Sequence, residues 1–107
     1  MRKIISKTHI ITEDELEVMH LIEEDPIISQ RILADRSGFS IGKVNYCLKG
    51  LANIGFIKIG NFRKSNNKLN YAYVITPKGI EQKIAITKKF IAKKRLEYDK
   101  LTSYLNK

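Results

Sequence analysis

The segment from Ser29 to Ile54 constrains the fold more than any other part of this 107-residue chain. It holds two stretches with helical spacing of apolar residues, separated by Ser37-Gly38-Phe39. Ser29 and Ser40 can cap the two helices, because a serine oxygen accepts a hydrogen bond from a backbone N–H that lacks an intrahelical partner. Gly38 lies where the chain must turn, and glycine takes a positive φ at little cost. The pattern predicts two short helices joined by a tight turn.

The second predicted helix has an apolar face that points back to the first. Val44, Leu48 and Leu51 recur at spacings of four and three. Ala34 is small enough to let the helices cross closely, and Cys47 is expected in the core, since a free cysteine behaves as a small hydrophobe. A small residue, a turn glycine and a buried Val at this spacing resemble the helix-turn-helix, whose second helix enters the major groove of DNA.

The positive charge lies almost entirely after residue 26. Residues 1–26 hold three basic and seven acidic side chains, whereas residues 27–107 hold seventeen basic and four acidic ones, within a formal net charge of +9. Such asymmetry favours a polyanion as the partner. The alternative is that the lysines serve only solubility.

Length and composition limit the class of protein. A chain of 107 residues forms one domain with a modest core, and a deep pocket is not expected. The single cysteine excludes an intramolecular disulfide and a multi-cysteine metal site. The first residues contain no apolar run long enough for a signal peptide or a membrane span. We therefore expect a cytoplasmic protein without a membrane partner.

The N-terminal part begins with an arm, residues 1–11, whose isoleucines favour docking over free solvation. Thr12 and Glu15 fit a capping box, so a helix is expected from about Glu13 to Glu24. Asp25-Pro26 ends this helix, because a residue before proline is pushed out of the helical region. Ile27-Ile28 is predicted to form no more than an edge-strand fragment.

A β-hairpin is predicted after the second helix of the motif, where Gly55 acts as a left-handed helix stop. Residues 56–62 and 71–76 alternate as strands do, and residues 63–68 form a polar, basic turn between them. A hairpin in this position makes a winged helix. Its tip is expected to lie against phosphates or in a minor groove, the alternative being a solvated tip. The candidate contacts are Arg63, Lys64, Asn66, Asn67 and Lys68.

The last predicted element is a long helix. Thr76 caps it, Pro77 occupies its first turn, and it can run to about Tyr104, a length on the order of 40 Å. Apolar residues recur every seven positions, which predicts a homodimer paired through this helix, although the stripe could instead fold back on its own domain. The predicted dimerisation residues are Ile80, Ile84, Ile91, Tyr98, Leu101 and Leu105.

The expected organisation is thus an arm (1–11), a winged helix-turn-helix domain (12–76) and a C-terminal dimerisation helix (77–107). The expected fold class is mainly α with a small β-hairpin.

The sequence Ile75-Thr76-Pro77-Lys78-Gly79 after a basic wing resembles the MarR-type winged-helix regulators, in which a similar step opens the dimerisation helix. The resemblance covers residues 12 to about 105. Residues 40–49 and 73–79 are similar to small MarR-like regulators associated with exopolysaccharide biosynthesis genes. The resemblance implies a homodimeric transcriptional repressor on an inverted-repeat operator, and the narrower similarity implies that polysaccharide genes are its target. In the wing only Arg63 matches the family pattern, and because the chain is shorter than typical members, no small-molecule effector is predicted.

The outward face of the second motif helix holds the predicted base contacts. Lys43 can donate to guanine, Asn45 can pair with adenine, and Tyr46 can touch a thymine methyl group or a phosphate. The alternative is an ordinary solvated helix. The full predicted set is Ser40, Gly42, Lys43, Asn45, Tyr46 and Lys49, in which Ser40 and Lys49 contact phosphates and Gly42 permits close approach.

An enzyme is not expected, because the chain has only two histidines and no Gly-rich phosphate loop. No cofactor or metal is predicted. His20 with Glu23, Glu24 and Asp25 could hold a metal ion, but a solvated or pH-tuned histidine fits the pattern better. The remaining alternative is a winged helix used for protein contact or RNA binding.

Overall fold

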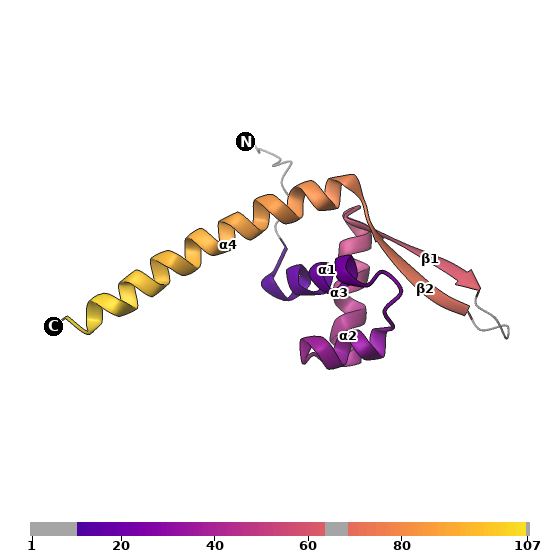
Figure 1. The fold of residues 1–107 in the computed structure, drawn as a ribbon, viewed down its shortest axis with the longest axis horizontal. Coiled ribbons are helices and arrows are strands. Elements are labelled where there is room, and N and C mark those ends of the chain that lie inside the picture. The colour runs from indigo at the N-terminus through magenta and orange to yellow at the C-terminus, as the bar shows by residue number, and fades with distance from the viewer. Residues whose placement is uncertain (1–10, 64–68, 107) are drawn as a thin grey trace, which may run out of the picture.

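The computed structural model describes residues 11–63 and 69–106, with residues 61–63 and 69–71 described by their backbone alone. In that part the elements follow in the order α1 (Glu13–Glu24), α2 (Gln30–Ser37), α3 (Ile41–Asn53), β1 (Ile57–Arg63), β2 (Leu69–Ile75) and α4 (Pro77–Tyr104). Figure 1 shows α1, α2 and α3 gathered in one body, from which the hairpin and α4 extend to opposite sides. The predicted fold class is confirmed.

The first helix begins and ends where its local signals place it. Glu15 N–H donates to Thr12 Oγ1 at 3.1 Å, and Thr12 N–H donates to Glu15 Oε1 at 2.9 Å, which completes the capping box. Ile27-Ile28 forms no strand and lies in the turn between α1 and α2, which agrees with the prediction of no more than an edge-strand fragment. This turn is tied to the sheet by a backbone hydrogen bond, in which Tyr73 N–H donates to the Pro26 carbonyl at 2.8 Å.

The helix-turn-helix forms as predicted. Ser29 Oγ accepts from Ile32 N–H at 3.1 Å, and Ser40 Oγ accepts from Lys43 N–H at 3.0 Å. Gly38 adopts φ +80°, and its N–H donates to the Ala34 carbonyl at 2.9 Å. The positive φ lets α2 end and α3 begin within three residues. The inward face of α3 is fully buried, as expected for Val44, Cys47, Leu48 and Leu51.

The hydrophobic core lies where the three first helices meet the base of the hairpin and the start of α4. Its buried side chains form one continuous cluster, to which the hairpin contributes from its base and α4 from its first half. The buried apolar residues are Ile11, Val18, Met19, Ile22, Ile28, Leu33, Ala34, Val44, Cys47, Leu48, Leu51, Phe56, Ile57, Tyr73 and Ile86.

The hairpin is antiparallel, with a register that runs from Ile57↔Ile75 to Arg63↔Leu69. Gly55 adopts φ +81°, which confirms the predicted helix stop. The second strand begins two residues earlier than predicted, and Arg63 belongs to β1 rather than to the tip. The prediction relied on alternating side-chain polarity, whereas the ladder is made by backbone groups and continues past polar residues.

The start of α4 is bonded to the turn between α3 and β1. Thr76 Oγ1 accepts from Gly79 N–H at 3.0 Å and donates to the Gly55 carbonyl at 2.6 Å. Thr76 N–H donates to the Phe56 carbonyl at 3.0 Å, and Lys78 Nζ donates to the Ile54 carbonyl at 3.2 Å. These bonds fix the direction in which α4 leaves the body.

Most of α4 then projects away from the domain (Figure 1). Ile86 is buried and Phe90 is half-buried against the core, but every residue from 91 to 106 is exposed. The apolar stripe therefore does not fold back on the described part of the chain. Among the described residues, none of the helices combines the length and the apolar character that a membrane span requires.

Gly79 provides a test of this junction. A Cβ at Gly79 would lie 2.2 Å from the Phe56 carbonyl oxygen and 3.0 Å from Ile75 Cγ2. We expect Gly79→Ala to lower the free energy of unfolding by about 1–3 kcal/mol, because the backbone must shift to admit the methyl group. Gly42→Ala is the matched control, since its Cβ would meet only Ser40 Oγ, at 3.9 Å. The control should leave stability unchanged or raise it by up to about 1 kcal/mol. Urea unfolding at one protein concentration measures both, and equal effects would contradict this account.

Candidate nucleic-acid interface

The outer face of α3 is open to solvent. Gly42, Tyr46 and Lys49 are exposed along one row, opposite the buried face of the same helix. Tyr46 is 75% exposed although it is a large aromatic residue, so the packing of the domain leaves it uncovered. Asn45 is only half-buried and lies at the edge of this row, while Ser40 is exposed at the helix start, where its oxygen already serves as the cap. The structure therefore brings most of the predicted contacts onto one face.

Sequence reasoning missed Asn53, which continues the same row. It is exposed and follows Gly42, Tyr46 and Lys49 at helical spacings of four, three and four. It lies in the last turn of α3, which was treated as a helix end rather than as part of the outer face. The period that selected the other residues would have found it.

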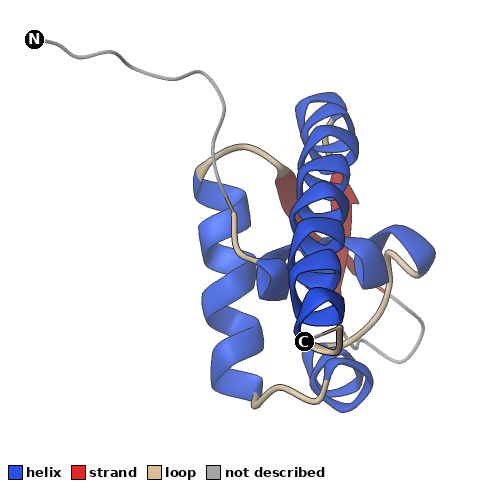
Figure 2. Cartoon of the chain, turned by 90° about the vertical axis from the view of Figure 1, so that its left-hand side faces the viewer, coloured by secondary structure: helices blue, strands red, loops and turns tan. Residues whose placement is uncertain are grey.

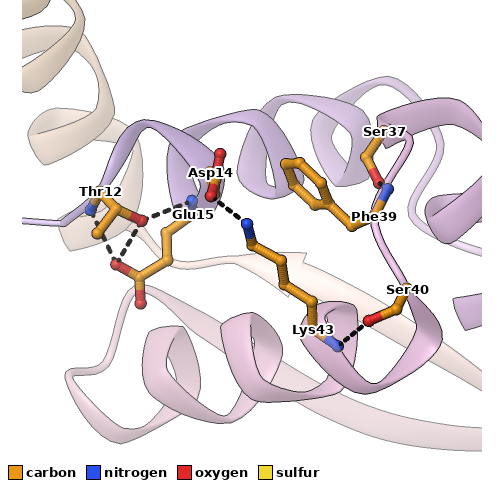
Figure 3. Close-up of polar contacts among 7 residues, drawn as sticks. All are labelled: Thr12, Asp14, Glu15, Ser37, Phe39, Ser40 and Lys43. Atoms are coloured by element: carbon orange, nitrogen blue, oxygen red, sulfur yellow. Dashed lines mark hydrogen bonds and ion pairs between the residues drawn. The ribbon is translucent and has the colours of Figure 1, made fainter.

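The side chain of Lys43 does not share this row. Figure 3 shows it running sideways from α3 toward the first turn of α1. Its Nζ lies 2.5 Å from Asp14 Oδ2 and 4.6 Å from the centroid of the Phe39 ring. The hydrogen bond that the Lys43 ammonium donates to Asp14 raises the pKa of Lys43. The prediction placed Lys43 outward, but tertiary packing gives it an intramolecular partner.

A second contact places acidic residues beside α3. A Cβ at Gly50 would lie 2.9 Å from Glu15 Oε2, so the first turn of α1 approaches α3 closely at this glycine. Lys43 and Gly50 are seven residues apart and share one flank of the helix. Glu13, Asp14 and Glu15 form the first turn of α1. One flank of α3 is therefore bordered by carboxylates, while its outer row is not.

The first helix of the motif, α2, carries two cations that the sequence analysis did not select. Arg31 and Arg36 of α2 are both exposed, and neither has an ion pair with any other described residue. In helix-turn-helix proteins the first motif helix crosses the DNA backbone. Both arginines are therefore candidates for phosphate contacts.

The predicted wing contacts fall mostly outside the described residues. Lys64, Asn66, Asn67 and Lys68 are not described, and Arg63 is described only by its backbone, at the end of β1. The register carries the strands as far as Arg63 and Leu69, away from the body (Figure 1). Residues 1–10 of the arm also lie outside the described part, so only Ile11 is placed, in the core.

His20 lies in the contact between α1 and α4. Its Nδ1 lies 3.1 Å from Lys83 Nζ and its Nε2 lies 3.4 Å from Glu24 Oε2. A charged lysine can only donate, so Nδ1 accepts and Nε2 carries the proton toward Glu24. Lys83 also pairs with Glu23, and this hydrogen bond lowers the pKa of Glu23. Figure 2 shows α1 passing behind α4. The described residues contain no group of three or more His, Cys, Asp or Glu that could hold a metal ion.

Comparison with known proteins agrees with this geometry. A family profile described as "Winged helix-turn-helix DNA-binding" matches residues 15–58, which include α2, α3 and the start of β1. The fold is a winged helix-turn-helix. No curated protein matches the chain in sequence.

Several solved structures share this fold. A mutant of ZitR from Lactococcus lactis is 20% identical with a TM-score of 0.63, and the match covers 96% of this chain and 67% of that one. A second ZitR mutant, solved in complex with DNA, is 19% identical with a TM-score of 0.61, covering 94% and 68%. MepR, a transcription regulator of a Staphylococcus aureus multidrug efflux pump, is 17% identical with a TM-score of 0.59, covering 90% and 76%. The chain thus spans about two thirds of the length of the ZitR structures.

Cys47 is a core residue of α3, as predicted, and its reactivity tests the packing of that helix. It is 2% exposed, and burial raises the pKa of its thiol. We expect a thiol reagent at neutral pH to label Cys47 only as fast as the protein unfolds, because the reactive thiolate is both scarce and covered. Ser103→Cys, on the exposed end of α4, should label promptly in the same molecule. Equal native rates for the two thiols, measured by mass spectrometry, would contradict this packing.

Proposed function

We propose that this protein is a MarR-type transcriptional regulator that binds double-stranded DNA with sequence specificity, as a homodimer. The observation that carries the proposal is the solvent-exposed outer row of α3, which is the second helix of the helix-turn-helix in a winged-helix fold. The excess of basic residues after residue 26 supports a polyanionic partner. The similarity to a ZitR structure in complex with DNA supports a duplex over RNA or a protein partner.

The outer row of α3 would enter the major groove. Gly42 lets the helix end come close to the duplex, Asn45 can bond both edges of an adenine, and Tyr46 can contact a thymine methyl group or a phosphate. Lys49 and Ser40 would contact phosphates, which position the helix without reading sequence. Residues of the wing would hold the adjacent backbone or minor groove through Arg63, Lys64, Asn66, Asn67 and Lys68.

The dimer would form through α4. The six predicted dimerisation residues, here called the seam, are between 45% and 84% exposed. A helix with such an exposed apolar stripe needs a partner to cover it. We infer an inverted-repeat operator with half-sites about one helical turn, roughly 34 Å, apart. Repression as the mode of action, and polysaccharide biosynthesis genes as the target, rest only on the resemblance of residues 40–49 and 73–79 to regulators of such genes. The seam residues are Ile80, Ile84, Ile91, Tyr98, Leu101 and Leu105.

Selection of bound duplexes from a random pool, followed by binding at several salt concentrations, tests the DNA contacts. We expect a palindromic consensus and an affinity that falls steeply with salt. Tyr46→Ala should weaken binding to the consensus by about 1–3 kcal/mol while sparing random DNA, and Lys49→Met should reduce the salt slope by about one. Lys100→Met, exposed near the far end of α4, is the matched control and should change neither. Retention on heparin without any selected sequence would instead favour an RNA-binding or protein-binding module.

The dimer has a separate test. We expect Ile91→Glu combined with Tyr98→Glu to give a monomer in analytical ultracentrifugation, because two charges would be buried without partners at the centre of the seam. Lys89→Glu also adds negative charge to exposed α4, but on the opposite side of the helix. This control should remain dimeric. A wild-type protein that is monomeric at micromolar concentration would refute the seam.

A further inference from the structure

We propose that Asp14 withholds Lys43 from DNA, so that α3 docks through the row Gly42, Tyr46, Lys49 and Asn53 while the acidic turn of α1 keeps phosphates off its Lys43 flank. Asp14 is thus a positioning residue for recognition. The inference rests on the proposed DNA-binding function and names a determinant of how the duplex is approached.

Two contacts hold the Lys43 ammonium on the flank of α3. Asp14 Oδ2 lies 2.5 Å from Nζ, and the face of the Phe39 ring lies 4.6 Å away (Figure 3). A carboxylate and the face of an aromatic ring both attract a cation, so Asp14 and Phe39 together hold the Lys43 ammonium in place. The ammonium is thereby drawn back toward α1 and does not reach outward with Tyr46.

The pair is built on fixed backbone at both ends. Asp14 sits in the first turn of α1, which the Thr12–Glu15 capping box orders, and Lys43 sits in the first turn of α3, which Ser40 caps. Phe39 is held by its own N–H, which donates to Ser37 Oγ at 3.1 Å. The ammonium is therefore positioned by the packing of α1 against α3 and by Phe39 in the turn between α2 and α3.

The charges around the pair decide which side of α3 a duplex can approach. A phosphate that came within reach of Lys43 would also come close to the Asp14 carboxylate, and Glu15 lies on the same flank at Gly50. Repulsion between the two anions opposes the attraction to the single lysine. The outer row has no carboxylate in its sequence from Gly42 to Asn53, so phosphates meet only Lys49 and polar groups there.

The pair is also suited to removal by mutation. The side chains of Lys43 and Asp14 are 46% and 42% exposed, and exposed ion pairs contribute little to folding. Either residue can therefore be replaced without unfolding the domain. Asp14→Asn keeps the shape of the side chain but removes the charge, which frees Lys43 to contact DNA.

A double-mutant cycle on the selected duplex tests the inference. Wild type, Asp14→Asn, Lys43→Met and the double variant are titrated at several salt concentrations. We expect Asp14→Asn to steepen the salt slope by about 0.9, the value for one added phosphate contact, and to tighten binding several-fold at low salt. Lys43→Met alone should leave the slope unchanged, and the double variant should lose the gain of Asp14→Asn.

Asp35→Asn is the matched control for general charge. Asp35 is exposed on α2 and has no ion pair among the described residues, so its removal takes away one negative charge without releasing a lysine. Any effect of Asp35→Asn should survive in the Lys43→Met background. If the effect of Asp14→Asn also survives in the Lys43→Met background, the inference is overturned. It is equally overturned if Lys43→Met alone reduces the salt slope of the affinity by about one. A wild type that binds no duplex would refute the proposed function itself, which is a different result.

Discussion

The arrangement of this protein depends on the close contact between the first turn of α4 and the backbone of Phe56. Gly79 has no side chain, and any Cβ there would lie 2.2 Å from the Phe56 carbonyl oxygen. Thr76 completes the contact by bonding to the Gly55 and Phe56 carbonyls. The first half of α4 packs on the domain through Ile86 and Phe90, whereas its second half leaves the domain with an exposed apolar stripe. The proposed dimer follows from that exposure.

The packing of α1 has a comparable effect on the DNA-binding face. The chain separates acidic residues at its start from basic residues later on, and the fold then places the acidic first turn of α1 beside α3. The separation of acidic from basic residues along the sequence thus gives α3 one flank that is bordered by carboxylates and an outer row that is not. The outer row stays available to a polyanion, whereas the flank is neutralised by the pair of Asp14 with Lys43. Recognition in this account depends on which side chains are free as much as on which are present.

The contact between α1 and α4 connects the two regions. Lys83 of α4 bonds to Glu23 and His20 of α1, and Lys94 bonds to Glu13 at 3.0 Å. These ties join the element that borders α3 to the element proposed to pair with a second copy. The first helix thus contacts both α3 and α4, through different side chains.

The sequence by itself determined the local features: the serine and threonine caps, the left-handed turns at Gly38 and Gly55, the buried face of α3 and the extent of α4 to Tyr104. These signals lie within a few residues of the structure that they specify, so they can be read without knowing the fold. Only the tertiary structure decided the partner of Lys43, the inclusion of Arg63 in β1 and the absence of a strand at Ile27-Ile28. Each of these depends on which distant segment packs next to the residue. An ion pair or a backbone hydrogen-bond ladder forms only between segments that the tertiary fold brings together.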